Sequence, residues 1–216
     1  MSGTLVVPAV VAASAGIVAG VIRWPVRPML AVRVLTAVAV VVSVTVTAVI
    51  ALLTAGFAAR LSLMAPVLAS CPVIPAHHEV SLLQGVLASL LLGVGAARVL
   101  RVRRRWRRAT NHADGSRFRI VDDDKLIAFA VPGDPGCVVV SRGLLDRLQP
   151  RERKVVFAHE RAHLRLGHHR YIYASELATA LVPFLAPLSA QIRLATERSA
   201  DEAAVEALGG DRRVVA

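Results

Sequence analysis

Three long apolar runs dominate the first half of the chain. They cover residues 4–22, 34–59 and 80–100, and each is long enough to cross the roughly 30 Å hydrocarbon core of a bilayer as a helix. After Leu100 charged residues become frequent and the apolar pattern stops. The pattern predicts a membrane domain over 1–100 with three transmembrane helices, a basic juxtamembrane linker over 101–108 and a further domain over 109–216.

The last of these regions combines short strand-like stretches with helical periodicity. Residues 118–121, 125–131 and 137–141 are rich in β-branched and aromatic side chains, and the Pro-Gly-Asp-Pro-Gly segment 132–136 favours a turn between the last two. Pro150 then suits the first turn of a helix. The predicted fold is a mainly α membrane protein with three transmembrane helices, followed by a small α+β domain with a short sheet.

The segment 159–163 reads His-Glu-Arg-Ala-His and carries the first candidate chemistry. Residues four apart lie on the same face of a helix, so His159 and His163 can point their imidazoles at one metal ion, while Glu160 stays free for proton transfer. Three protein ligands and a water are typical of a catalytic zinc, which lowers the pKa of that water toward neutrality. The alternative is a pair of buried histidines with ordinary hydrogen bonds.

Glu197 and Asp201 offer the second half of such a site. They are four apart in a stretch rich in Ala, Leu and Glu, which favours a helix, so both carboxylates share one face. One can bind the metal while the other orients a ligand imidazole from behind. The alternative is an acidic helix face that only contacts solvent.

These residues, together with 128–133 and 138–145, resemble the gluzincin metallopeptidases of membranes. The chain is similar to the HtpX and CAAX-prenyl-protease type, and more closely to the peptidase part of the β-lactam sensor-transducer family. The resemblance covers roughly residues 118 to 207 and implies a zincin-like fold for the α+β domain.

The resemblance also implies a zinc-dependent endopeptidase of a bacterial membrane. It implies Zn²⁺ as the cofactor, with His159, His163 and Glu197 matching the ligand positions. Glu160 matches the general base, and Asp201 matches the acid that supports a ligand imidazole.

The segment 167–169, Gly-His-His, departs from the acidic residue expected there in the sensor-transducers and looks more like the HtpX type. No penicillin-binding sensor follows Glu197 before Ala216, so the resemblance does not extend to ligand sensing. Peptide hydrolysis also needs a donor for the oxyanion besides the metal. The candidates, chosen only by their proximity in sequence, are His168, His169, Tyr171 and Tyr173.

A fourth apolar segment, 171–192, separates the two halves of the site. One crossing of the bilayer here would put His163 and Glu197 on opposite sides of the membrane, where they could not share an ion. Two crossings need about forty apolar residues, roughly twice the number present. Pro183 and Pro187 therefore favour a bent hairpin or interfacial helix that associates with the membrane and returns.

Arginines predict the orientation of the membrane domain. They follow the first run at Arg23, Arg27 and Arg33, and they follow the third at Arg98, Arg101, Arg103, Arg104, Arg105, Arg107 and Arg108. The loop between the second and third runs holds only Arg60. By the positive-inside rule, the amino terminus faces outside and everything after residue 101 is cytoplasmic in this multi-pass protein of the cell membrane.

The net charge of +11 raises the question of nucleic acid as a partner. The only basic patch of that kind surrounds Trp106 next to a membrane exit, which favours anionic lipid of the inner leaflet over nucleic acid.

Cys71 and Cys137 lie on opposite sides of the membrane in this topology, so no disulfide joins them. Residues 77–79 favour a solvated cap of the third span over a weak metal or pH-sensing site, and the triple aspartate 122–124 favours a polar turn over a second cation site.

Three functions fit these patterns. The first is a membrane-anchored zinc endopeptidase that cuts cytoplasmic or membrane-protein substrates, either a repressor in signalling or damaged proteins in quality control. The second is a catalytically idle membrane adaptor or signalling protein that keeps the zinc fold. Glu160 argues against it, because an idle site needs no base. The third is a membrane-tethered DNA-binding regulator, which the chain does not support with any helix-turn-helix pattern.

Overall fold

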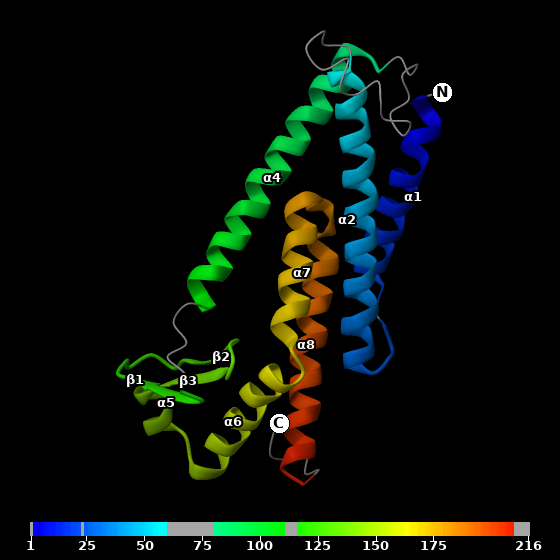
Figure 1. Ribbon diagram of the computed structural model, residues 1–216. Coiled ribbons are helices and arrows are strands. Elements are labelled where there is room, and N and C mark those ends of the chain that lie inside the picture. The colour runs from blue at the N-terminus through cyan, green and yellow to red at the C-terminus, as the bar shows by residue number, and fades with distance from the viewer. Residues whose placement is uncertain (1, 23, 60–79, 111–115, 210–216) are drawn as a thin grey trace. The chain divides into compact units, whose positions relative to one another are not determined.

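The computed structural model describes residues 2–22, 24–59, 80–110 and 116–209 (Figure 1). The chain is mainly helical with one small sheet. In order, the elements are α1 (Ser2–Val21), α2 (Pro28–Ala58), α4 (Leu82–Thr110), β1 (Phe118–Val121), β2 (Ala128–Val131), β3 (Cys137–Ser141), α5 (Arg142–Arg147), α6 (Pro150–Arg165), α7 (His168–Leu181), the 3₁₀ turn Pro183–Leu185 and α8 (Ala186–Ala207). Arg23, Arg60, Cys71 and the segment 77–79 lie outside the described residues.

Two of the described helices, α2 and α4, are long and apolar enough to cross a membrane. In α1 the apolar stretch Val6–Val21 is shorter than such a span. The described residues thus contain two candidate spans, and the membrane domain with a third span over 4–22 stays a prediction.

Helix α4 continues through the segment 101–108, which the sequence predicts as a linker, and ends only at Thr110. Arginine and alanine both have high helix propensity, so a change from apolar to charged composition does not require the helix to stop. The arginine cluster is therefore carried on a regular helix, with most of its side chains exposed.

The described residues divide into two compact units. The first contains the described residues within Met1–Arg23, Leu35–Val102 and Ala174–Ala190, and the second contains those within Trp24–Val34, Arg103–Tyr173 and Gln191–Ala216. Because α2, α4, α7 and α8 each contribute residues to both units, the division follows packing and not the linear order of the chain. The sheet, α6 and the site residues all belong to the second unit.

In the first unit, α7 and α8 form a helical hairpin within the segment 171–192. The chain turns at Pro183–Leu185, and the side chains of Ser175 and Ser189 hydrogen-bond across the two arms at 3.0 Å. Close packing against α1 depends on Gly20, where a Cβ atom would lie 2.8 Å from the backbone nitrogen of Leu188. Leu188 is completely buried there. The prolines and this packing give the segment a returning path instead of a single straight helix.

The sheet of the second unit has the strand order β1-β3-β2. The apolar sequence of β3 fits its central position, since every residue of that strand is buried. β1 pairs with β3 in parallel and β2 pairs with it antiparallel, so β2 is an edge strand of the described sheet. The predicted strand 125–131 is shortened at its start because the buried Ser141 hydroxyl accepts the Ile127 N–H and donates to the Lys125 carbonyl.

Helices α6 and α8 meet through small residues in the second unit. Ala162 of α6 packs against Ala200 and Ala203 of α8, with Leu166 at the margin of the cluster. Such small side chains permit close approach of two helices, since the distance between helix axes depends on the residues at the contact. We call this contact the alanine seam, and it brings the His159–His163 segment next to Glu197.

Candidate metal centre

Local interactions define both ends of α6, the helix that carries the two histidines. At its start the backbone N–H of Gln149 donates to the Glu152 carboxylate at 2.6 Å, and Pro150 occupies the first turn. At its end Gly167 adopts a φ of +66°, which a side chain would strain, and its N–H donates to the Leu164 carbonyl at 3.2 Å. The glycine reverses the chain so that α7 begins immediately at His168.

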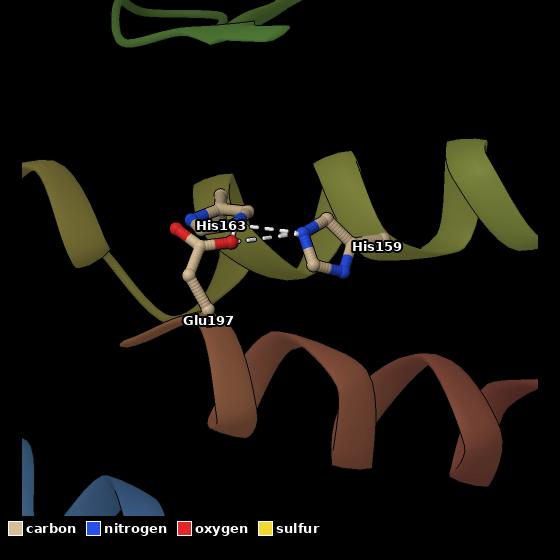
Figure 2. A group of neighbouring side chains, drawn as sticks. All are labelled: His159, His163 and Glu197. Carbon is tan, nitrogen blue, oxygen red and sulfur yellow. Dashed lines mark hydrogen bonds and ion pairs between the residues drawn. The ribbon is translucent and has the colours of Figure 1, made fainter. Parts of the chain in front are cut away.

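Three ligand-type side chains converge between α6 and α8 (Figure 2). The Nε2 atoms of His159 and His163 lie 3.1 Å apart. The Glu197 carboxylate oxygen Oε2 is 3.4 Å from the first and 3.6 Å from the second. The two imidazole nitrogens and one carboxylate oxygen thus form a nearly equilateral triangle.

The dimensions of this triangle fit a tetrahedral zinc ion. Zinc bonds to nitrogen and oxygen of about 2.0–2.1 Å at tetrahedral angles place neighbouring ligand atoms about 3.3 Å apart. The three separations, from 3.1 to 3.6 Å, surround that value. Two imidazoles and one carboxylate are also a ligand set typical of catalytic zinc, which leaves a fourth position for water or substrate.

Asp201 supports His159 from the side away from the triangle. Its Oδ1 atom lies 2.9 Å from Nδ1 of His159, so the imidazole donates its Nδ1–H to the carboxylate and leaves Nε2 as a lone pair. Half of the Asp201 side chain is exposed, at 53%, against 23% for His159. The contact is therefore a charge-assisted hydrogen bond to a half-exposed carboxylate.

His163 is supported differently, by a buried chain of neutral groups. Its Nδ1 lies 3.0 Å from Nδ1 of His168, and Nε2 of His168 lies 2.7 Å from the Ser199 hydroxyl. Burial lowers the pKa of His163 below its usual value, against the opposing charge of Glu197. Burial and the neighbouring imidazoles lower the pKa of His168 to about 4, so both rings are neutral near pH 7.

Glu160 projects into the same region from the next position on α6. Burial raises the pKa of its carboxyl above the usual value, and the charge of Glu197 raises it further. His159 and a hydrogen bond from the backbone N–H of Ala130 act in the opposite direction. A carboxylate with a raised pKa close to a metal site has the properties of a general base.

A cleft of about 560 Å³ opens onto the two histidines, Glu160 and Glu197. One wall is the edge strand β2 with the following Pro132, and another is the end of α4, through Trp106 and Ala109. Because the N–H of Ser141 bonds to the carbonyl of Ile127, the pairing register turns the backbone groups of Ala128 and Ala130 away from β3. The free edge of the sheet therefore borders the cleft.

The four residues considered as oxyanion donors occupy different places. His169 lines the cleft beside the metal centre, whereas His168 is completely buried behind His163. Tyr173 packs its ring against Trp106, with ring centroids 5.1 Å apart, and borders a neighbouring hollow. Tyr171 is not among the described residues that line the cleft.

Sequence reasoning missed the link between His168 and Ser199. Both residues belong to segments that the sequence singles out, but neither is predicted to contact a ligand. The only signal is the glycine before His168, which shortens the connection between two helices.

The triple aspartate forms a polar turn, in which Asp123 accepts the Lys125 N–H and Asp122 pairs with Arg142.

Comparison with known proteins gives one family. The family model for peptidase family M48 matches residues 96–205, which is half of the chain and includes the sheet, α6, α7 and the Glu197 region of α8. No curated protein and no solved structure matches the chain.

Proposed function

The chain belongs to peptidase family M48, whose members are metallopeptidases, and on this premise we propose that it is a membrane-anchored zinc endopeptidase of the gluzincin type. The observation that carries the proposal is the triangle of His159, His163 and Glu197, whose sides fit tetrahedral zinc. In this proposal those three residues are the ligands, Glu160 is the general base and Asp201 orients His159. His159-Glu160-x-x-His163 followed by a distant glutamate is the ligand order that the proposal requires.

Peptide hydrolysis can be assigned to groups of this chain. When bound, a zinc ion would polarise the scissile carbonyl and acidify the attacking water. Glu160 takes the proton from that water and passes it to the leaving amine, a role that its raised pKa supports. His169 is the one residue of the four donor candidates that lines the cleft, so it is the candidate to stabilise the oxyanion.

The edge strand β2 suits an extended peptide as substrate. The N–H of Ala130 already donates to Glu160, but the outward backbone groups of Ala128 and the outward carbonyl of Ala130 can pair with a substrate strand by β-augmentation, which would hold a peptide bond over the centre. The apolar side chains of Leu164 and Ile172 line the same cleft. A cleft of mixed backbone edge and apolar walls favours unfolded or extended segments of proteins over small molecules.

The location that we propose is the cytoplasmic face of the cell membrane. The two candidate spans, together with α1 as a third, anchor a chain whose amino terminus faces outside. The exposed arginines at the end of α4 would bind anionic lipid of the inner leaflet. Substrates are then cytoplasmic proteins or parts of membrane proteins, such as a repressor in signalling or damaged proteins in quality control.

The variant Glu160→Gln tests the enzymatic role. We expect the full-length protein in detergent to bind one zinc ion per chain and to cleave itself or a labelled unfolded protein. Glu160→Gln should keep the zinc and lose the cleavage, while Glu202→Gln, an exposed amide substitution on α8, should behave as the unchanged protein. Equal cleavage by Glu160→Gln would contradict the mechanism, and zinc binding without cleavage by the unchanged protein would favour the idle adaptor.

A further inference from the structure

The second nitrogen of His163 begins a chain of hydrogen bonds that ends at a backbone carbonyl. Nδ1 of His163 meets Nδ1 of His168 at 3.0 Å, and Nε2 of His168 meets the Ser199 hydroxyl at 2.7 Å. The hydroxyl in turn donates to the Thr196 carbonyl at 3.1 Å. His168 is completely buried, and Ser199 is 4% exposed, so water does not compete for these bonds.

Only one direction of hydrogen bonding satisfies every group and leaves the ligand atom of His163 free. The Thr196 carbonyl can only accept, so it takes the hydroxyl hydrogen of Ser199. The Ser199 oxygen then accepts from Nε2–H of His168, which leaves Nδ1 of His168 as a lone pair. That lone pair accepts the Nδ1–H of His163, and the remaining nitrogen of His163, Nε2, carries no hydrogen and faces the triangle.

The opposite direction would disable the ligand. If Ser199 donated to His168, the hydrogen of His168 would move to its Nδ1 and point at Nδ1 of His163. A neutral His163 would then carry its hydrogen on Nε2, where a metal ion must bind. The tautomer of the ligand is therefore coupled to a hydroxyl on α8, the helix that also carries Glu197.

We propose that His168 and Ser199 are positioning residues that hold His163 in its metal-binding tautomer before an ion arrives. The proposal rests on the proposed function, because it requires His163 to be a metal ligand. The two histidine ligands then differ in their support: His159 has an exposed carboxylate, and His163 has a buried neutral relay. Gly167 makes the relay possible, because its φ of +66° folds His168 back onto the helix that has just ended.

Zinc affinity measured by competition with a chromogenic chelator tests the relay in the full-length protein in detergent. His168→Leu removes the acceptor for Nδ1–H of His163 and fills the site with an apolar side chain, and we expect it to weaken zinc binding about 10–100-fold. His168→Asn places the amide oxygen where Nδ1 stood and keeps the acceptor, so binding should stay within a few-fold of the unchanged protein. Ser199→Ala should weaken binding about tenfold.

A purely structural role predicts a different order of the variants. Leucine fills a buried site better than asparagine, so metal-free His168→Leu should be the more heat-stable of the two while binding zinc more weakly. Ser189→Ala is the matched control for Ser199→Ala, because it removes a buried hydroxyl from α8 whose hydrogen bond goes to Ser175 and not to the relay. The visible absorption of Co²⁺-substituted protein should change in Ser199→Ala and His168→Leu and stay the same in Ser189→Ala.

The results separate the relay from the enzyme assignment. Failure of the unchanged protein to bind zinc overturns both proposals. If the unchanged protein binds zinc and both Ser199→Ala and His168→Leu bind it with the same affinity as the unchanged protein, the relay alone is overturned. Parallel losses of affinity and heat stability, with His168→Asn the weaker binder of the His168 pair, also overturn it.

Discussion

Asp201→Ala removes the carboxylate that receives the Nδ1–H of His159. The metal-free fold should survive, since the Asp201 side chain is 53% exposed and its hydrogen bond is the 2.9 Å contact with that imidazole. Loss of an outer partner of a metal-binding imidazole weakens metal binding by about 10–100-fold. Because half of this carboxylate is in water and its charge is screened, we expect the lower end, about tenfold or about 1.4 kcal/mol.

Two further variants make the prediction sharp. Asp201→Asn keeps an acceptor oxygen but loses the charge, so the loss of zinc affinity should be about two- to threefold. Glu202→Ala removes the same charge from the next residue of α8, which is exposed, and should leave affinity unchanged. The measurement is a zinc titration against a chromogenic chelator, with thermal unfolding of the metal-free proteins as the check on folding. Equal zinc affinity in Asp201→Ala and the unchanged protein would refute the reasoning, and an equal loss in Glu202→Ala would show that only the overall charge matters.

Further predictions concern packing, pH and topology. Gly20→Ala places a Cβ atom 2.8 Å from the backbone of Leu188 and should lower the free energy of unfolding by about 1–3 kcal/mol in a thermal unfolding assay. Gly93→Ala is the control, because a Cβ atom there meets nothing within 4 Å, and it should be neutral or stabilising. His168 takes a proton near pH 6.5 when unfolded and only near pH 4 when folded, so the unfolded state binds more protons in that window and stability should fall as the pH drops through it, by up to about 3 kcal/mol. Denaturation of the metal-free protein at several pH values checks this, and the pH dependence should be smaller in His168→Leu; an unchanged slope in that variant would contradict the assignment. A reporter fused after residue 110 should behave as a cytoplasmic protein, and activity outside the cell membrane would overturn the proposed orientation.

Local patterns predicted those parts of the structure that depend on neighbouring residues. The start of α6 at Pro150 and the shared face of His159 and His163 follow from helix geometry alone. The strands at 118–121 and 137–141 appear with the predicted bounds, since their β-branched runs end at turn residues. The shared face of Glu197 and Asp201 also follows from their helical spacing. The choice of Glu197 as the ligand depends on the family resemblance, because no periodicity relates two separate helices.

The missed features depend on tertiary contacts. The continuation of α4 to Thr110 is not indicated by the change to charged composition after Leu100, although arginine is a good helix former. β1 pairs in parallel with β3, although β2 lies between them in the sequence, and strand patterns alone do not indicate this pairing. The His168–Ser199 contact requires both the left-handed turn at Gly167 and the close approach of α8, so neither segment indicates it separately.

The alanine seam has a consequence for the choice of metal. Three methyl groups lie where α6 and α8 meet, and such small side chains allow a close approach of the helices that carry the histidine pair and Glu197. A bulkier residue at Ala203 would push α6 and α8 apart and lengthen the distances between the ligand atoms without contacting a ligand. The ionic radius that the centre prefers would then depend on the size of residue 203. As that side chain becomes larger, the affinity for larger divalent ions should rise relative to the affinity for zinc.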